Sequence, residues 1–198
     1  MGRPRKFVEA DVLTRAGETF ARQGYGGTSV DDLARATGVG KQSLYNAFGG
    51  KRELFLKALS AKTAEALALV DEELGGEGST PLERIKAQVL RLAITFSDPA
   101  PAGFFVTKAA VEMADQDEEV ARSALAAYEQ LEAIYRQCIE DAQASGEVDE
   151  SANAGELAAY FVALTRGMEV LGAAGVGRAR LTGIAVTSLS VLPVIHAG

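Results

Sequence analysis

Residues 28–48 read TSVDDLARATGVGKQSLYNAF, and this stretch decides the fold. Hydroxyl residues at its start can cap a short helix, and acidic residues follow in the first turn, where the helix dipole favours negative charge. Gly38 then supplies the positive φ that a tight turn needs. Val39 and Leu44 form the apolar pair that holds a second helix on the first. This spacing predicts a helix-turn-helix, whose second helix enters the major groove of DNA.

The outward positions of the second predicted helix carry short or flexible polar side chains rather than a solubilising run of Glu and Lys. They are Lys41, Gln42, Ser43, Tyr45 and Asn46. A generic helical hairpin would show neither the glycine turn nor this polar set. A lone helix-turn-helix pattern nevertheless has false positives, so the rest of the chain has to support it.

The sequence pattern predicts helices in the rest of the chain as well. Apolar residues recur at helical spacing, for example at Val89, Leu92 and Phe96, and no long stretch alternates with period two. Predicted breaks lie at Gly24 and at residues 75–78, 97–103, 145–155 and 172–177, with Thr80 and Asn153 as helix caps. We therefore predict an all-α protein of roughly nine or ten helices. An N-terminal three-helix helix-turn-helix domain would precede a larger helical domain.

Charge is unevenly spread along the 198 residues, whose net charge is −7. Residues 1–57 hold ten Lys or Arg against six Asp or Glu, a balance of +4, whereas the remainder carries −11. A basic N-terminal module on an acidic body is the polarity expected of a small DNA-binding domain attached to something else. Chance variation between solvated helix faces is the alternative, and charge alone does not separate the two.

Composition argues against several other classes of protein. The single cysteine, Cys138, excludes a disulfide framework, and the single histidine, His196, argues against His-based metal sites and Ser-His-Asp chemistry. No apolar run approaches the ~20 residues of a membrane helix, and no apolar signal stretch follows the basic N-terminus. We expect a cytoplasmic protein with no membrane partner, no metal and no cofactor.

The chain closely resembles the N-terminal domain of TetR-family transcriptional regulators over about residues 8–57. The residues that carry the resemblance are Gly24-Tyr25, Thr28-Ser29-Val30, Leu33-Ala34, Thr37-Gly38-Val39-Gly40, Leu44-Tyr45, Phe48, Lys51 and Leu54. The resemblance implies a DNA-binding domain over residues 1–50, with a basic arm at 1–7 and the helix-turn-helix at 28–48. Residues 51–198 would then form a ligand-binding and dimerisation domain.

The resemblance also assigns roles to individual positions. Thr28, Ser29, Tyr45 and Lys51 would contact backbone phosphates of double-stranded DNA. Gln42, Ser43 and Asn46 would face base edges, and Lys41 would reach either guanine or phosphate. Two departures from the family pattern affect the second helix. Gly40 stands where the family often has Ser, which weakens the cap, and Asn46-Ala47 replaces a bulkier pair.

The basic arm has two readings. Arg3 and Arg5 belong either to a disordered solubilising tail or to a probe of the DNA minor groove, where arginine suits narrow A·T-rich sequence. We favour the probe, because a predicted DNA-binding element follows directly.

The body would form a homodimer and bind a small-molecule effector. Residues 120–144 and 153–172 are the candidates for a four-helix dimer bundle, although their apolar stripes can equally be intramolecular core. The candidate ligand-binding residues are Phe96, Phe104, Phe105, Lys108, Glu112, Met113, Tyr128, Phe161 and Arg166. Each aromatic alone is more often plain core, and only the collection indicates a pocket. Cys138 is expected to be a buried structural thiol rather than a redox sensor.

The implied function is that of a transcriptional repressor that leaves a palindromic operator when a small molecule binds; the resemblance leaves activation open. Two other classes compete with it. An enzyme would need a motif that the chain lacks, since no phosphate-loop, dinucleotide or zinc-protease pattern is present. A helical protein-interaction adaptor without DNA binding would show no salt-dependent retention on DNA.

Overall fold

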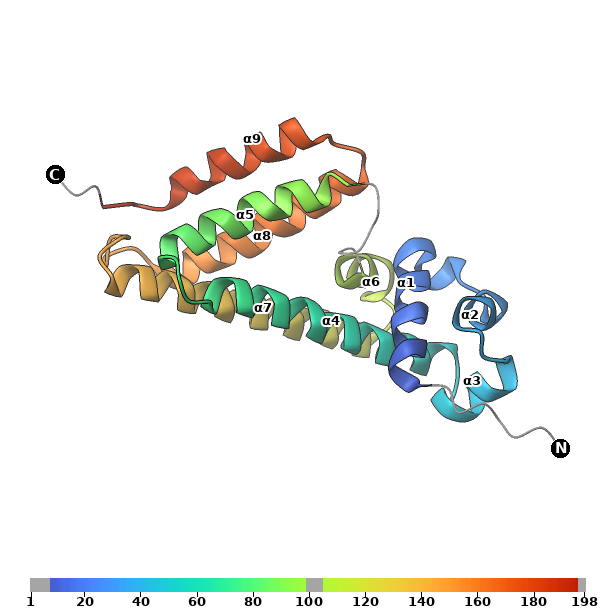
Figure 1. The fold of residues 1–198 in the computed structure, drawn as a ribbon. Coiled ribbons are helices and arrows are strands. Elements are labelled where there is room, and N and C mark those ends of the chain that lie inside the picture. Colours follow the sequence, from blue (N-terminus) through green and yellow to red (C-terminus); the bar gives the residue numbers. More distant parts are fainter. Residues whose placement is uncertain (1–7, 99–104, 196–198) are drawn as a thin grey trace. The chain divides into compact units, whose positions relative to one another are not determined.

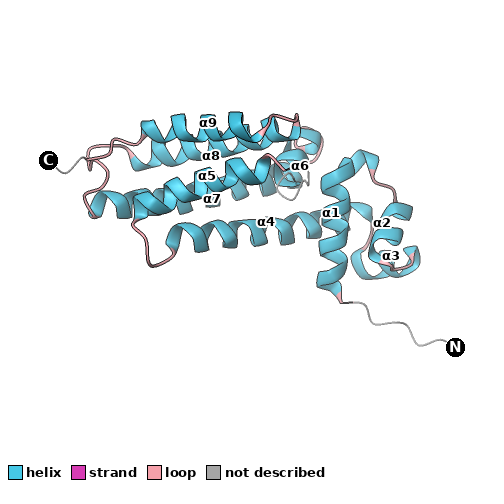
Figure 2. Cartoon of the chain, turned by 45° about the horizontal axis from the view of Figure 1, so that its top comes forward, coloured by secondary structure: helices cyan, strands magenta, loops and turns pink. Residues whose placement is uncertain are grey.

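The computed structural model describes residues 8–98 and 105–195, and this part of the chain is almost entirely helical (Figures 1 and 2). Its nine α-helices are α1 (Glu9–Gly27), α2 (Val30–Thr37), α3 (Lys41–Phe48), α4 (Lys51–Gly75), α5 (Pro81–Phe96), α6 (Phe105–Met113), α7 (Glu118–Ala144), α8 (Ala154–Ala173) and α9 (Arg178–Ser188). A short 3-10 helix, Leu189–Val191, follows. Within the described ranges, an isolated bridge between Val148 and Val194 is the one β-type pairing. The prediction of an all-α protein is confirmed.

Local sequence signals set most of the helix boundaries. Gly24 was predicted to end the first helix; it has a positive φ of 76° and puts a kink in α1, which continues to Gly27. Thr80 forms a capping box with Glu83 at the start of α5, and the Asn153 side chain accepts two backbone N–H groups at the start of α8. The predicted caps are therefore confirmed.

The helices pack as two compact units. The first contains residues 1–65 and 104–124, and the second contains residues 66–103 and 125–198. This division groups α6 and the first turns of α7 with the N-terminal helices. It reflects packing rather than function, so the assignment of residues 1–50 to DNA binding stays a prediction.

In the first unit, α1 lies between α6 and the α2–α3 pair (Figure 1). Its core contains an aromatic cluster from three helices: Phe20 of α1, Phe55 of α4 and Phe105 of α6. The Phe20 and Phe55 rings meet edge to face with centroids 5.0 Å apart, and Phe55 meets Phe105 in the same way at 5.4 Å. Edge-to-face pairs add about 0.5–1.5 kcal/mol to the burial of the rings themselves.

An ion pair joins the turn after α6 to the start of α4 in the same unit. Arg52 donates two hydrogen bonds to the Asp117 carboxylate, at 2.7 and 2.9 Å, and a third to Glu119 at 2.9 Å. Asp117 also accepts the backbone N–H groups of Glu119 and Val120 at the start of α7. Hydrogen bonding from Arg52 lowers the pKa of Asp117 to about 2.

In the second unit, α5, α8 and α9 lie side by side and enclose a core with α7 (Figure 2). Tyr135 of α7 is fully buried and stacks on Phe161 of α8 with ring centroids 5.7 Å apart. Its hydroxyl donates to Gln88 of α5 at 2.5 Å. α5 and α8 approach so closely that a Cβ on Gly172 would overlap the carbonyl oxygen of Phe96.

Most of the apolar stripe of α7 is intramolecular core, although Leu125 near the start of the helix is 58% exposed. Leu131, Tyr135 and Cys138 are at most 6% exposed and pack inside the second unit. Burial raises the pKa of the Cys138 thiol, which fits a structural residue. Exposed apolar residues are also found on α8 and α9, where Val170 and Val186 are 51% and 56% exposed.

Asp117→Asn is expected to lower the free energy of unfolding by about 1 kcal/mol, because it removes the Arg52 ion pair and keeps a side chain that can cap α7. The pKa of Asp117 is lower in the folded protein than its ordinary value of 3.8, so the ionised carboxylate stabilises the fold at pH values above 3.8. That stabilisation is lost as the pH falls toward about 2. Urea unfolding of both proteins from pH 7 to pH 2.5 measures the difference. It should be constant above pH 5 and shrink below pH 4. Glu119→Gln, at the more exposed partner of Arg52, should have the smaller effect; a pH-independent difference would contradict the assignment.

Candidate nucleic-acid interface

The start of α2 is presented to solvent by Ser29. Its hydroxyl accepts the N–H of Asp32 at 3.1 Å and donates to the Asp32 carboxylate at 2.5 Å. The Asp32 side chain in turn accepts the N–H of Ser29, which completes a capping box. These hydrogen bonds from Ser29 hold the pKa of Asp32 below its ordinary value. The hydroxyl is exposed at a helix start, but its proton is directed to Asp32, so a phosphate would have to compete with that carboxylate. The phosphate contact of Ser29 stays a prediction.

Thr28, which the sequence placed beside Ser29 as a phosphate contact, is buried. Only 1% of its surface is exposed, and its hydroxyl donates to the carbonyl of Gly24 at 2.6 Å. This placement favours a structural role for Thr28, which ties the start of α2 to the kink in α1.

The turn between α2 and α3 has the geometry that the sequence predicts. Gly38 is in the left-handed region, with φ 71° and ψ 13°, and its N–H closes α2 on the carbonyl of Ala34. Val39 and Leu44 are 8% and 4% exposed and pack against Leu33 in the core of the first unit. Burial of this pair fixes α3 on α2.

All five outward residues predicted for α3 are exposed: Lys41, Gln42, Ser43, Tyr45 and Asn46. Two of them interact with each other, because the Gln42 amide donates to the Asn46 side chain at 3.0 Å. Which amide atom donates is an assignment based on hydrogen bonding. The pair leaves the Gln42 side-chain oxygen and the Asn46 amide N–H groups available to base edges.

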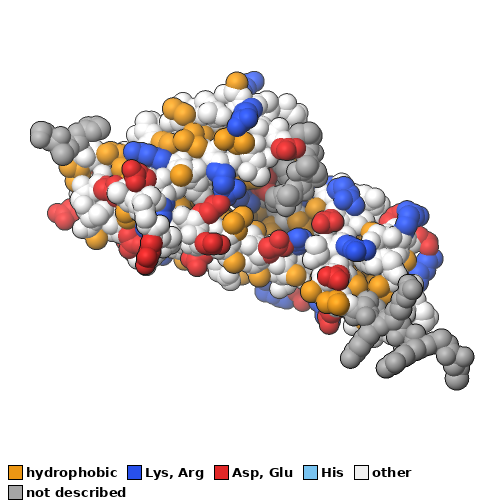
Figure 3. Space-filling view, viewed as in Figure 1, with side chains coloured by type: hydrophobic (Ala, Val, Ile, Leu, Met, Phe, Trp, Pro, Cys, Tyr) orange, Lys and Arg blue, Asp and Glu red, His pale blue; other side chains and the backbone are white. Residues whose placement is uncertain are grey.

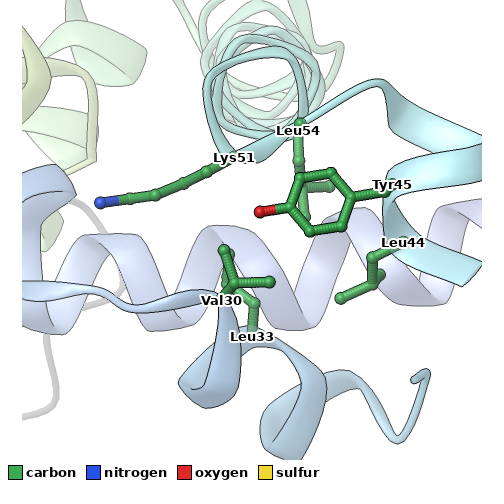
Figure 4. Close-up of a pocket in the computed structure, with 7 residues that line it drawn as sticks. Val30, Leu33, Leu44, Tyr45, Lys51 and Leu54 are labelled. Carbon is green, nitrogen blue, oxygen red and sulfur yellow. The ribbon is translucent and has the colours of Figure 1, made fainter. Parts of the chain in front are cut away.

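Two basic residues at this surface already have partners. Lys41 pairs with Asp31 at 2.6 Å across the turn, so a phosphate or guanine would have to compete with that carboxylate. Lys51, at the start of α4, lies over the ring of Tyr25 with its ammonium 4.1 Å from the ring centroid. Lys51 and Tyr45 also border a small hollow that is lined as well by Leu33, Leu44 and Leu54 (Figure 4). The hollow places both predicted phosphate contacts on one surface.

The predicted arm residues Arg3 and Arg5 lie outside the described part of the chain, so the minor-groove probe stays a prediction.

The nine candidate ligand-binding residues do not belong to one unit. Phe96, Tyr128, Phe161 and Arg166 are in the second, whereas Phe105, Lys108, Glu112 and Met113 are in the first. Phe104 lies outside the described residues. Phe105 and Met113 are buried in the core of the first unit, and Phe96 and Phe161 in that of the second.

The two charged candidates on α6 are engaged with α1. Lys108 donates to the carbonyls of Ala21 and Arg22, at 3.2 and 3.0 Å, and Glu112 accepts the N–H groups of Tyr25 and Gly26. These contacts favour a structural role over ligand anchoring. In the second unit, Arg166 pairs with the buried carboxylate of Glu169 at 2.9 Å.

Two further negative findings concern the described residues. They contain no helix that is long and apolar enough to cross a membrane. Among the same residues, His, Cys, Asp and Glu side chains form no group of three that could hold a metal ion.

Known proteins and family models are similar to this chain in both its N-terminal and its C-terminal part. Residues 12–58 match the family model for bacterial regulatory proteins of the tetR family, and residues 81–175 match the model described as tetracyclin repressor-like, C-terminal domain. The HTH-type transcriptional regulator YezE of Bacillus subtilis (strain 168) is 35% identical over 163 residues, covering 81% of this chain and 84% of the relative. The transcriptional repressor ComR of Escherichia coli (strain K12) is 26% identical over 193 residues, which span 97% and 92% of the two chains.

Solved structures are also similar over nearly the full length, and one of them is bound to DNA. It is a cysteine mutant of the TetR family transcriptional regulator CifR complexed with 26-base-pair operator DNA. The TM-score is 0.86 at 27% sequence identity, and the match covers 97% of this chain and 100% of the other.

Gly40→Ser is expected to stabilise the first unit. Gly40 is the N-cap of α3 and supplies no side-chain hydrogen bond, and a Cβ there would meet no atom within 4 Å. A serine hydroxyl can accept a free N–H in the first turn, and replacing glycine also restricts the unfolded chain, so we expect a gain of about 0.5 kcal/mol. Chemical denaturation compares the variant with Gly40→Ala, which gains no cap. Equal stability of the Ser and Ala variants would show that the cap is not the weak point of α3.

Proposed function

The chain belongs to the TetR family of bacterial DNA-binding transcriptional regulators, and from this premise we propose that it is a repressor released from a palindromic operator by a small molecule. The observation that carries the proposal is the exposed polar face of α3, with Gln42 and Asn46 in contact on it. The names of its relatives support repression, because ComR, BdcR and DhaR are each described as transcriptional repressors. Its relatives and its family are regulators, not enzymes.

In this proposal, contacts to phosphate and to bases come from different residues. Ser29, Tyr45 and Lys51 bind phosphate and set the register of the protein on the duplex. Gln42, Ser43 and Asn46 read base edges in the major groove, and Lys41 exchanges its Asp31 partner for DNA. The solved CifR complex with double-stranded operator DNA supports this arrangement, because its fold matches that of the present chain.

We assign dimerisation to a face formed by α8 and α9. A groove there is lined by Tyr160, Leu164, Ile184 and Val191 among others, and hydrophobic side chains reach the surface over α5 and α9 (Figure 3). Gly167 and Gly183 lie in these two helices, and a Cβ on either would meet nothing within 4 Å. Small residues on an apolar helix face allow close approach of a second helix pair. The partner on this face would be a second copy of the chain related by two-fold symmetry, as binding to a palindromic operator requires.

We place the effector in the second unit, near Phe96, Tyr128, Phe161 and Arg166. The amide nitrogen of Gln88 supports this location. It belongs to a residue only 2% exposed, and among the described residues it has no hydrogen-bond partner. A buried donor without a partner costs free energy, so an effector that carries a hydrogen-bond acceptor would be stabilised there. Fluorescence anisotropy of labelled operator, read during titration with acceptor-bearing small molecules, tests for release.

Selection of bound sequences from random duplex DNA tests the DNA-binding proposal and yields the operator. We expect a palindrome with half-sites about one helical turn apart, ~34 Å. Recovery of no enriched sequence by folded, dimeric protein free of small molecules would contradict the proposal.

Gln42→Ala should weaken binding to that operator by ~1–3 kcal/mol and relax selection at one base position in each half-site. Tyr45→Phe, which removes only an exposed hydroxyl, should weaken all sequences alike. Anisotropy titrations and a repeated selection separate the two effects. An unchanged motif with Gln42→Ala would show that another residue reads that position.

Gly183→Glu is expected to break the dimer without disturbing the chain's own packing, because its side chain enters open space. A symmetric interface would bury two such charges, one from each protomer, so the dimer Kd should rise by about 100-fold or more. Sedimentation velocity measures the change. Ala133→Glu, at an exposed position of α7, adds the same charge as a control. A dimer that survives Gly183→Glu would place the interface elsewhere.

A further inference from the structure

The carboxylate of Glu112 binds the backbone at the kink of α1. One oxygen accepts the N–H of Tyr25 at 3.0 Å and the other accepts that of Gly26 at 2.7 Å. Successive N–H groups that point to one place form a concavity suited to an anion. Glu112 is separated from these partners by 86 and 87 residues, so the contact joins α6 to the N-terminal helices.

Glycine makes room for this carboxylate. Gly24 has a φ of +76°, and a Cβ there would lie 2.5 Å from a Glu112 oxygen. At Gly26 the corresponding distance would be 3.3 Å. The kink of α1 and the side chain of Glu112 therefore fit each other sterically as well as by charge.

Lys108, one turn earlier on α6, binds the other side of the same kink. Its ammonium donates to the carbonyls of Ala21 and Arg22, where the first part of α1 ends. A cation on free carbonyls and an anion on free N–H groups are each matched to the local backbone dipoles. Together the two side chains hold the backbone on both sides of Gly24.

The segment held in this way carries the proposed phosphate contacts. The Tyr25 ring lies under the Lys51 ammonium, and the Gly24 carbonyl accepts the Thr28 hydroxyl directly before Ser29. Movement of residues 24–28 would therefore displace both Lys51 and the start of α2.

We propose that Glu112 is a positioning residue for DNA phosphate recognition, acting through the backbone of residues 24–28 on Ser29 and Lys51. The inference rests on the phosphate contacts of the proposed function. Phosphate contacts carry no base information, so Glu112 sets affinity for operator and unrelated DNA alike. α6 is then part of the DNA-binding unit, although more than fifty residues separate it from the helix-turn-helix.

Glu112→Gln tests the proposal in the full-length protein. The amide keeps the size of the side chain but turns one acceptor into a donor that faces a backbone N–H. We expect affinity for the selected operator and for an unrelated duplex to fall about tenfold each, with the selected motif unchanged. The slope of log K against log salt concentration should become shallower by about 1 per protomer as the Lys51 phosphate contact is lost.

Glu118→Gln is the matched control, because it removes the same charge from a 94% exposed side chain in the same unit. Glu112→Asp retains the charge but is one methylene too short for both N–H groups. It should show the same shallower slope, and it decides the question if the Gln variant does not fold. An affinity and salt slope equal to those of Glu118→Gln, or a changed motif, would overturn the proposal. Failure of the wild-type protein to select any DNA would instead refute the proposed function.

Discussion

The packing of Phe20 against Phe55 and Phe105 is the contact on which the first unit depends. These rings come from α1, α4 and α6, so one cluster brings together segments separated by up to 85 residues. Because the cluster is buried, α6 must lie against α1 for the core to close. That requirement places Lys108 and Glu112 at the kink of α1. It also fixes α1, against which α2 packs.

The helix-turn-helix was predictable because every signal that defines it is local. The cap at Ser29, the left-handed Gly38 and the buried pair Val39 and Leu44 lie within sixteen residues, and the structure has each of them in the predicted role. The outward residues of α3 follow from helical periodicity once that turn is known. The burial of Thr28 did not follow, because two adjacent hydroxyl residues are equivalent caps until the preceding backbone is placed.

The functions of α6 and α7 were not predictable in the same way. Lys108 and Glu112 were predicted to anchor a ligand, because their backbone partners in α1 lie 86 residues away and cannot be identified from the sequence pattern. The apolar period of α7 is the same for a core stripe and for an interface stripe, and only the packing of Tyr135 and Cys138 in the second unit separates them. The exposed apolar face on α8 and α9 depends on which side α5 covers, which is again a tertiary property.

The residues proposed to read bases and those proposed to bind phosphate are held in place in different ways. Gln42 and Asn46 are supported by each other and by their own helix, so their geometry is set within a few residues. Ser29 and Lys51 depend on the kink at Gly24, whose backbone is held by side chains of α6. On the proposed contacts, a change that loosens α6 is expected to lower the affinity for DNA and leave the preferred DNA sequence unchanged, whereas a change on α3 is expected to alter the preferred DNA sequence. In the proposed function, specificity therefore comes from a local element, and the strength of binding comes from contacts that only the folded unit provides.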